Sequence, residues 1–373
     1  MALGNRIRTI LGHRRFPVCL VVAALLLTLP SLWIGWQADD YVHRLVMSGN
    51  LDEPATSLSW WNLFAFMDGN VQHTRTMKDR GVLPWWTVDT LRIAFWRPLT
   101  ALSHRLDYSL WPESPVLMHA HSLLWFGALV LVASLLYRRF LSPPWVAGFA
   151  ALLFALDDAR GFPAGWLANR NALLAVFFGL LTLVWYDKWR RDGWRPGLFL
   201  ALAAMVLALF SGEAALAVCA YLFAHALFLD EKAWPRRLFA LLPFALMVLI
   251  WFGLYFGLGY GTNGSGYYLD PVTEPLAYGR AALFRAPSCS QRDSSGCLLG
   301  DQFGSIPSGF TVLLSDEGRR IQWLVATGFL TLLCVLMRPL FKGNRTAGFF
   351  LVGSLLSLLP ICATMPHGRL LFF

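Results

Sequence analysis

Long apolar runs separated by short polar segments recur along this chain of 373 residues. Several runs reach about 18 to 20 residues, the length that a helix needs to cross the hydrocarbon core of a bilayer. Because a helix satisfies its own backbone hydrogen bonds, the pattern predicts an all-α fold, a single polytopic transmembrane bundle over residues 1–373. About nine spans are expected, at residues 16–36, 116–137, 144–156, 171–186, 197–210, 213–229, 238–259, 321–337 and 347–363.

Two longer polar segments interrupt this pattern, at residues 37–115 and 260–320. The first mixes tryptophans such as Trp60 and Trp85 with charged residues, which is typical of amphipathic helices lying in the membrane interface. The second contains Cys289 and Cys297, which could form a disulfide in an oxidising compartment, with two free thiols as the alternative. We therefore expect interfacial helices in the first segment and a lid in the second.

The composition supports a membrane protein and excludes a soluble one. Hydrophobic residues make up 57% of the chain and charged residues 14%, against about 25% charged in ordinary globular proteins. The net charge of +9 is spread over short basic clusters between the apolar runs, and these form no continuous basic face of the kind that binds nucleic acid. Such clusters lie on the cytoplasmic side of membrane proteins, so residues 37–115 and 260–320 are predicted to lie outside. In a bacterial cell this means the inner membrane, with both segments in the periplasm.

Two adjacent carboxylates, Asp39 and Asp40, follow the first predicted span directly. Ionisable residues at the edge of a span are expensive and often functional. Neighbouring carboxylates can share a metal ion, or one can raise the proton affinity of the other and make it a base. A helix N-cap at the same place would be purely structural, and the spacing leaves both interpretations open.

Other charged residues are predicted at the same membrane face. Asp157 and Asp158 end the third span, and Glu213 lies in the short hairpin between the fifth and sixth spans. Arg170 and Arg369 come to the same face, and arginine can bind phosphate through two parallel hydrogen bonds. Separately, each of these could be a rim charge that reaches water. Together they favour a site.

Several stretches resemble polytopic GT-C glycosyltransferases, in particular the transmembrane O-mannosyltransferases that carry tetratricopeptide repeats and their bacterial relatives. The resemblance runs over almost the whole chain, in the same order as in that family. Its parts are the acidic pair at 39–40, the stretch 96–119 with Arg97, His104, Asp107 and His119, the stretch Trp166 to Leu174, the hairpin at 210–213, and Gly368-Arg369-Leu370-Leu371.

The resemblance implies transfer of a sugar from a polyprenyl-phosphate donor, which arrives through the membrane, to an acceptor on the outer face. It implies Asp40 as the base, with Asp39 as its neighbour or alternate, and a second acidic site at Asp157, Asp158 and Glu213. Arg170 and Arg369 are expected to contact the donor phosphate, whose negative charge develops in the transition state. A divalent metal, Mg or Mn, is a possible cofactor on Asp39, Asp40 and Asp158. The acceptor could be a glycan, a lipid or a protein.

Two departures from the family leave alternatives open. The hairpin has Gly212-Glu213 where the family has Lys-Glu, so one expected cation is missing. The sequence also stops within the stretch around Arg369, so a truncated and inactive relative of the same fold is one alternative. A transporter or flippase for a lipid-linked or small polar solute is the other, although transporters place charges near the bilayer midplane.

Overall fold

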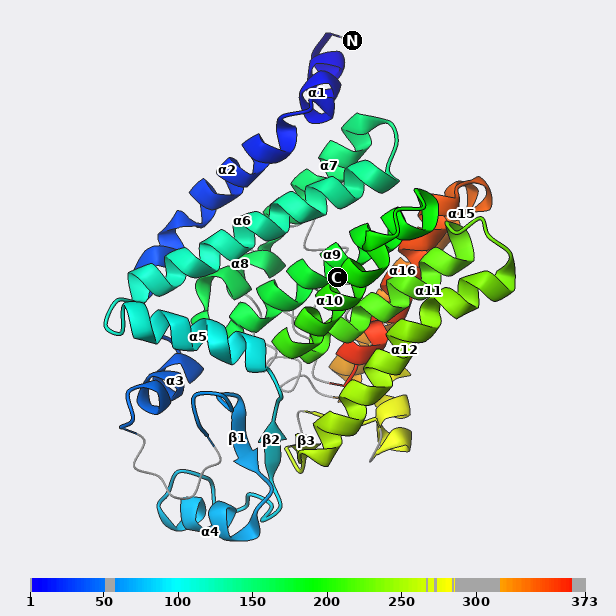
Figure 1. Cartoon of the computed structure of the whole chain (residues 1–373). Helices are drawn as coiled ribbons and strands as arrows, with labels where there is room; N and C mark the ends of the chain where they lie inside the picture. The colour runs from blue at the N-terminus through cyan, green and yellow to red at the C-terminus, as the bar shows by residue number, and fades with distance from the viewer. Residues whose placement is uncertain are drawn as a thin grey trace.

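The computed structural model describes residues 2–50, 58–265, 268–271, 274–283, 285 and 316–363. Within these ranges the chain forms a helical bundle with one small sheet at one end (Figure 1). Cys289, Cys297 and Arg369, together with the side chain of Asp158, lie outside the described residues.

The first half of the bundle packs α2 against α6 and α7. Its helices are α1 (Ala2–Gly12), α2 (Phe16–Thr28) with the 3₁₀ turn η1 (Leu29–Trp33), α6 (Pro115–Phe140) and α7 (Pro144–Leu156). Proline in the first turn of α6 and α7 favours helix initiation there, and Ser114 Oγ caps α6 by accepting a hydrogen bond from Leu117 N. Arg138 and Arg139 occupy the last turn of α6, where cations suit the helix dipole.

The second half is centred on α9, which packs against α6, α10 and α11. Its elements are η2 (Leu167–Asn169), α9 (Arg170–Arg191), α10 (Pro196–Ser211), η3 (Glu213–Leu216), α11 (Ala217–Phe228), α12 (Trp234–Gly257), α15 (Asp316–Gly343) and α16 (Arg345–Ile361). Helix α16 lies against α11, and its glycines Gly348 and Gly353 face the rings of Phe228 and Tyr221. One large hydrophobic cluster runs through both halves, from Leu20 on α2 to Phe349 on α16.

All nine predicted spans coincide with helices in the described part of the chain, but nine membrane crossings are not confirmed. Five helical segments are long and apolar enough to span a membrane, at 16–33, 115–140, 167–191, 234–257 and 323–341. Four more are apolar but shorter, at 144–156, 196–211, 213–228 and 345–361. At 1.5 Å per residue, the shortest of these four extends about 20 Å, less than a bilayer core of about 30 Å. The structure therefore supports a membrane protein with several spanning helices.

The segment 37–115 is more varied than predicted. It contains the expected helices α3 (Asp39–Met47), α4 (Val71–Asp79) and α5 (Pro98–Leu110), and also two strands that the sequence analysis missed, β1 (Ala65–Asp68) and β2 (Arg92–Ala94). Strand β3 (Gly261–Asn263), which follows α12, completes an antiparallel sheet in the order β1-β2-β3. The strands are too short to show an alternating pattern, and β3, one of the two partners of β2, is distant from it in sequence.

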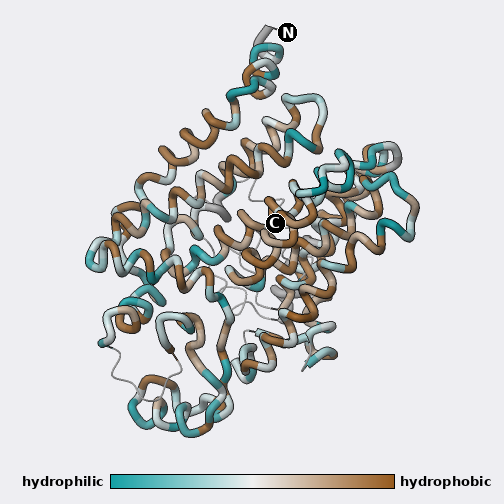
Figure 2. Tube along the Cα trace, in the orientation of Figure 1, coloured by the Kyte–Doolittle hydropathy of each residue, from teal (hydrophilic) through white to brown (hydrophobic). Residues whose placement is uncertain are grey.

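Hydrophilic residues gather at both ends of the bundle, with mostly hydrophobic helices between them (Figure 2). We call the end that carries the sheet, α3 and α5 the sheet end. At the opposite end, Arg138 donates to Arg14 O, Arg139 pairs with Asp192, Arg190 with Asp230, and Arg345 with Glu231. These contacts bring the polar turns that follow α1, α6, α9, α11 and α15 together, and we call this the basic end.

Candidate active site at the sheet end

The site is centred on the turn between η1 and α3, where the chain leaves the first apolar helix. Ala38, the residue before Asp39, has φ of 41°, a left-handed conformation that is strained for a residue with a Cβ. Such strain costs about 1–3 kcal/mol and often marks functional turns. His119 Nε2 lies 2.8 Å from Gly35 O, so α6 holds the start of this turn in place.

Asp40 is 1% exposed and both of its carboxylate oxygens accept backbone hydrogen bonds. Oδ1 accepts from Ala168 N at 2.7 Å and Oδ2 accepts from Gln37 N at 2.9 Å. Asp40 therefore closes its own turn and also fastens α3 to η2, which leads into α9. The N-cap interpretation is wrong, because the N-cap of α3 is Ala38 and no side chain caps this helix; Asp39 and Asp40 both lie in its first turn.

The surroundings of Asp40 change the pKa of its carboxyl group. Burial raises its pKa from 3.8 to about 6, although the hydrogen bonds from Gln37 and Ala168 partly offset this effect. The charge of Asp39 raises the pKa further, and that of Arg170 lowers it. A pKa near 6 suits a general base, because such a group is largely ionised at neutral pH but still has appreciable proton affinity.

A buried charge network lies behind this turn, where α5, α6 and α9 meet. Arg170 is fully buried, and its Nη1 is 2.5 Å from Asp107 Oδ2. The same guanidinium donates to Ser122 Oγ, Ser103 Oγ and Met118 O, each at 2.9 Å. Every nitrogen of Arg170 is thus engaged by the protein, which is what a buried cation requires.

His121 completes this network from α6. Its Nδ1 is 2.6 Å from Asp107 Oδ1, and its Nε2 is 3.0 Å from Trp125 Nε1. An indole nitrogen can only donate, so Nε2 must be the acceptor and the proton of a neutral ring lies on Nδ1, directed at Asp107. One carboxylate therefore forms an ion pair with Arg170 and accepts a hydrogen bond from His121. Ser103 belongs to the family-like stretch 96–119 but was given no role. The sequence patterns did not single out His121 or Ser122, because isolated polar residues on apolar helices carry no motif.

Arg97 and Glu213 join α5 to the hairpin before α11. Arg97 Nε and Nη2 lie 2.9 and 2.8 Å from Glu213 Oε2, and Thr100 Oγ1 donates to Ser211 O at 2.8 Å. The Arg97 side chain is 18% exposed, unlike that of Arg170. Glu213 is therefore engaged by Arg97, while Asp157 is half-buried at the end of α7.

The remaining residue of the 96–119 stretch, His104, packs against another buried histidine. The His104 and His43 rings are 5.4 Å apart, and burial lowers the pKa of His43 to about 3 and that of His104 well below its usual value. Both rings are neutral at physiological pH. Arg97, His104, Asp107 and His119 thus each contact a neighbouring element at the sheet end.

The described residues do not supply a complete metal site at this turn. Among the described side chains, no three His, Cys, Asp or Glu residues are arranged to hold a metal ion. Both oxygens of Asp40 are already engaged by backbone N–H groups, and Asp39 is half-buried beside it. We therefore derive no step through a metal.

A second buried network, at the basic end, was also missed. Asp187 accepts from Arg139 and lies 2.7 Å from His225 Nε2, and Arg190 pairs with Asp230 at 2.7 Å. The sequence analysis used these basic clusters only to orient the chain, because their acidic partners are separated from them in sequence.

No family model matches the chain, and searches of curated proteins and of solved structures likewise found no match. The resemblance to GT-C glycosyltransferases therefore depends on the residues of this chain alone.

Proposed function

We propose that the protein is a membrane glycosyltransferase that moves a sugar from a polyprenyl-phosphate donor to an acceptor hydroxyl at the sheet end. The observation that carries the proposal is Asp40, a buried carboxylate with a pKa of about 6 on a strained turn directly after an apolar helix. The order of family-like stretches in the sequence supports it.

In this reaction Asp40 removes the proton from the acceptor hydroxyl, whose oxygen attacks the anomeric carbon of the sugar. The bond between that carbon and the phosphate oxygen breaks, and polyprenyl phosphate leaves with the electron pair. Asp40 then returns its proton to water. Because Asp40 is 1% exposed, this role requires a movement that uncovers it, whereas half-buried Asp39 already reaches the surface. Asp39 is for this reason the alternate base.

Cations are needed to stabilise the leaving phosphate. Arg170, expected from the resemblance to bind this phosphate, has its nitrogens engaged by Asp107, Ser122, Ser103 and Met118. We therefore assign Arg170 a positioning role, with its field favouring ionised Asp40. Arg369, the other expected phosphate contact, lies outside the described residues. We assign Arg97 as a further phosphate contact, because its side chain is partly exposed although it is paired with Glu213.

The orientation follows from the positive-inside rule. The basic end is placed in the cytoplasm and the sheet end outside, in the periplasm of a bacterial inner membrane. We propose this orientation together with nine membrane spans.

The distribution of charge favours a transferase over a transporter. Residues 171–186 of α9 and 120–137 of α6 include no Asp, Glu, Lys or Arg, so the charges of these two long helices lie near their ends. Transporters place ionisable groups near the bilayer midplane and in broken helices.

The proposal is tested by donor consumption. The purified full-length protein in lipid nanodiscs is incubated with a panel of radiolabelled polyprenyl-phosphate sugars, and release of polyprenyl phosphate is measured against empty nanodiscs. We expect one donor to be consumed, which also identifies the sugar. Folded protein that consumes none of a broad panel, with glycan, lipid and peptide acceptors supplied, contradicts the transferase.

A further inference from the structure

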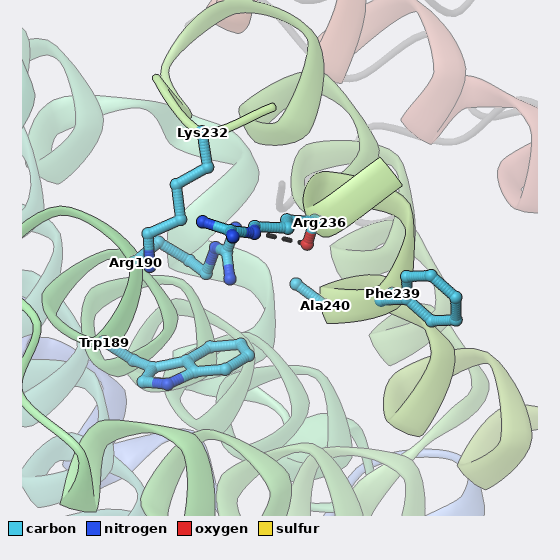
Figure 3. A pocket seen from close by; sticks show the side chains of 6 residues that line it. All are labelled: Trp189, Arg190, Lys232, Arg236, Phe239 and Ala240. Carbon is cyan, nitrogen blue, oxygen red and sulfur yellow. Dashed lines mark hydrogen bonds between the residues drawn. The ribbon is translucent and has the colours of Figure 1, made fainter. Parts of the chain in front are cut away.

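A pocket of about 340 Å³ opens at the basic end, between the end of α9 and the start of α12 (Figure 3). Its lining residues are Trp189, Arg190, Lys232, Arg236, Phe239 and Ala240. It lies at the end of the bundle opposite Asp40, so it has no part in the proposed transfer.

The pocket carries an excess of positive charge. Arg190 is paired with Asp230, both of its contacts being 2.7 Å, and its Nη2 donates to Arg236 O at 3.3 Å. Within the described chain, the Lys232 ammonium and the Arg236 guanidinium have no ion-pair partner. Three cations and one carboxylate leave the pocket short of two negative charges. The N-terminal end of α12, next to Arg236, adds to the preference for an anion.

Hydrogen bonds hold the backbone of the loop that carries Lys232, while the Lys232 and Arg236 side chains are exposed. Arg237 donates to Lys232 O at 2.6 Å and to Ala226 O at 3.0 Å, which fixes the loop that carries Lys232. The Arg190 guanidinium lies over the Trp189 ring, 4.9 Å from its centroid, so a cation–π contact on α9 stabilises this cation at the edge of the pocket. Three cationic side chains, from α9, α12 and the loop between α11 and α12, thus line the same pocket.

An apolar surface continues from the pocket along α12. Phe239 is 72% exposed and Leu249 65%, and Leu242, Leu246 and Ile250 are exposed on the same helix. Their spacing of three, four, three and one residues places them on one face. Helix α12 is also one of the segments long and apolar enough to span a membrane. A free anion would need only the cations, whereas an amphiphile with an anionic head and long chains fits both the pocket and this face.

We propose that this pocket binds the headgroup of an anionic phospholipid, with the phosphate between Lys232 and Arg236 and an acyl chain along the exposed face of α12. Basic pockets between membrane helices are known to hold such headgroups. A lipid bound here would neutralise the excess charge and join the start of α12 to the end of α9.

The test is lipid binding to the full-length protein in detergent micelles, followed by native mass spectrometry. Phosphatidylglycerol is titrated against phosphatidylcholine with the same acyl chains. The double variant Lys232→Ala, Arg236→Ala is compared with Arg195→Ala, Arg338→Ala, which removes the same charge from exposed positions at the same end but outside the pocket.

We expect wild type to prefer phosphatidylglycerol. The pocket variant should lose about thirtyfold in affinity, from about 1 kcal/mol for each cation near an anionic headgroup, and the control variant should change little. Lys232→Arg, Arg236→Lys should restore binding. An equal loss in both double variants, or no preference between the two lipids, would overturn the proposal. Displacement of the lipid by inorganic phosphate at equal concentration would assign the pocket to a free anion instead.

Discussion

The raised pKa of Asp40 predicts how stability depends on pH. Burial shifts this pKa from 3.8 to about 6, and a shift of about two units corresponds to about 3 kcal/mol at 1.36 kcal/mol per unit. The folded state thus binds the proton more tightly than the unfolded state does. The stabilising contribution of protonated Asp40 is complete below pH 4, is lost as pH rises to about 6, and stays constant above that.

The measurement is the free energy of unfolding of wild type and Asp40→Asn in mixed detergent micelles from pH 4 to pH 8. Asn cannot ionise, so the variant should lack this component. The difference, wild type minus variant, should fall by about 3 kcal/mol between pH 4 and pH 7. Other titrating groups contribute to both curves and cancel in the difference. Parallel curves would refute the assignment of a raised pKa to Asp40. If Asp40 is the base, transfer activity should rise over the same pH range.

Two further predictions concern packing. Asp107→Leu leaves the Arg170 cation buried without its partner and should destabilise the protein by about 3–5 kcal/mol in the same unfolding assay. Adding Arg170→Met removes the buried charge and should recover most of this loss. A double variant less stable than Asp107→Leu would contradict the pairing. Gly353→Ala places a Cβ 2.4 Å from Tyr221 Cδ1 and should destabilise the protein by about 1–3 kcal/mol. The control Gly253→Ala, whose Cβ would have nothing within 4 Å, should be neutral or stabilising. Equal effects of the two variants would count against this α11–α16 contact.

The helices could be predicted because their signal is local. Apolar runs located all nine predicted spans on described helices. The bounds agree at 144–156 and α7, and differ by up to six residues at 321–337, where α15 runs from Asp316 to Gly343. The small sheet could not be predicted, since Arg92 to Ala94 pair with Gly261 to Asn263, which follow α12. Strands of three or four residues carry too little periodicity to be recognised without their partners.

The candidate site shows the same limit. Asp39 and Asp40 were identified from their position after an apolar run, and Asp107 from a family-like stretch. That Asp107 holds both Arg170 and His121 depends on the packing of α5, α6 and α9, which no local pattern encodes. For the same reason, the resemblance implied a phosphate contact for Arg170, whereas in the structure Arg170 is buried and paired with Asp107.

In the proposed reaction, a carboxylate at the η1–α3 turn deprotonates the acceptor. The most direct measurement is the release of polyprenyl phosphate by wild type, Asp40→Asn and Asp39→Asn in nanodiscs at pH 7.5, with Asp79→Asn, an exposed carboxylate on α4, as the matched control. General-base catalysis contributes about 10²–10⁴-fold, so Asp40→Asn should lose at least a hundredfold in turnover while remaining folded. Asp39→Asn should lose less, and Asp79→Asn should equal wild type. Turnover of Asp40→Asn within a few-fold of wild type would exclude Asp40 as the base, and a loss confined to Asp39→Asn would assign the base to Asp39.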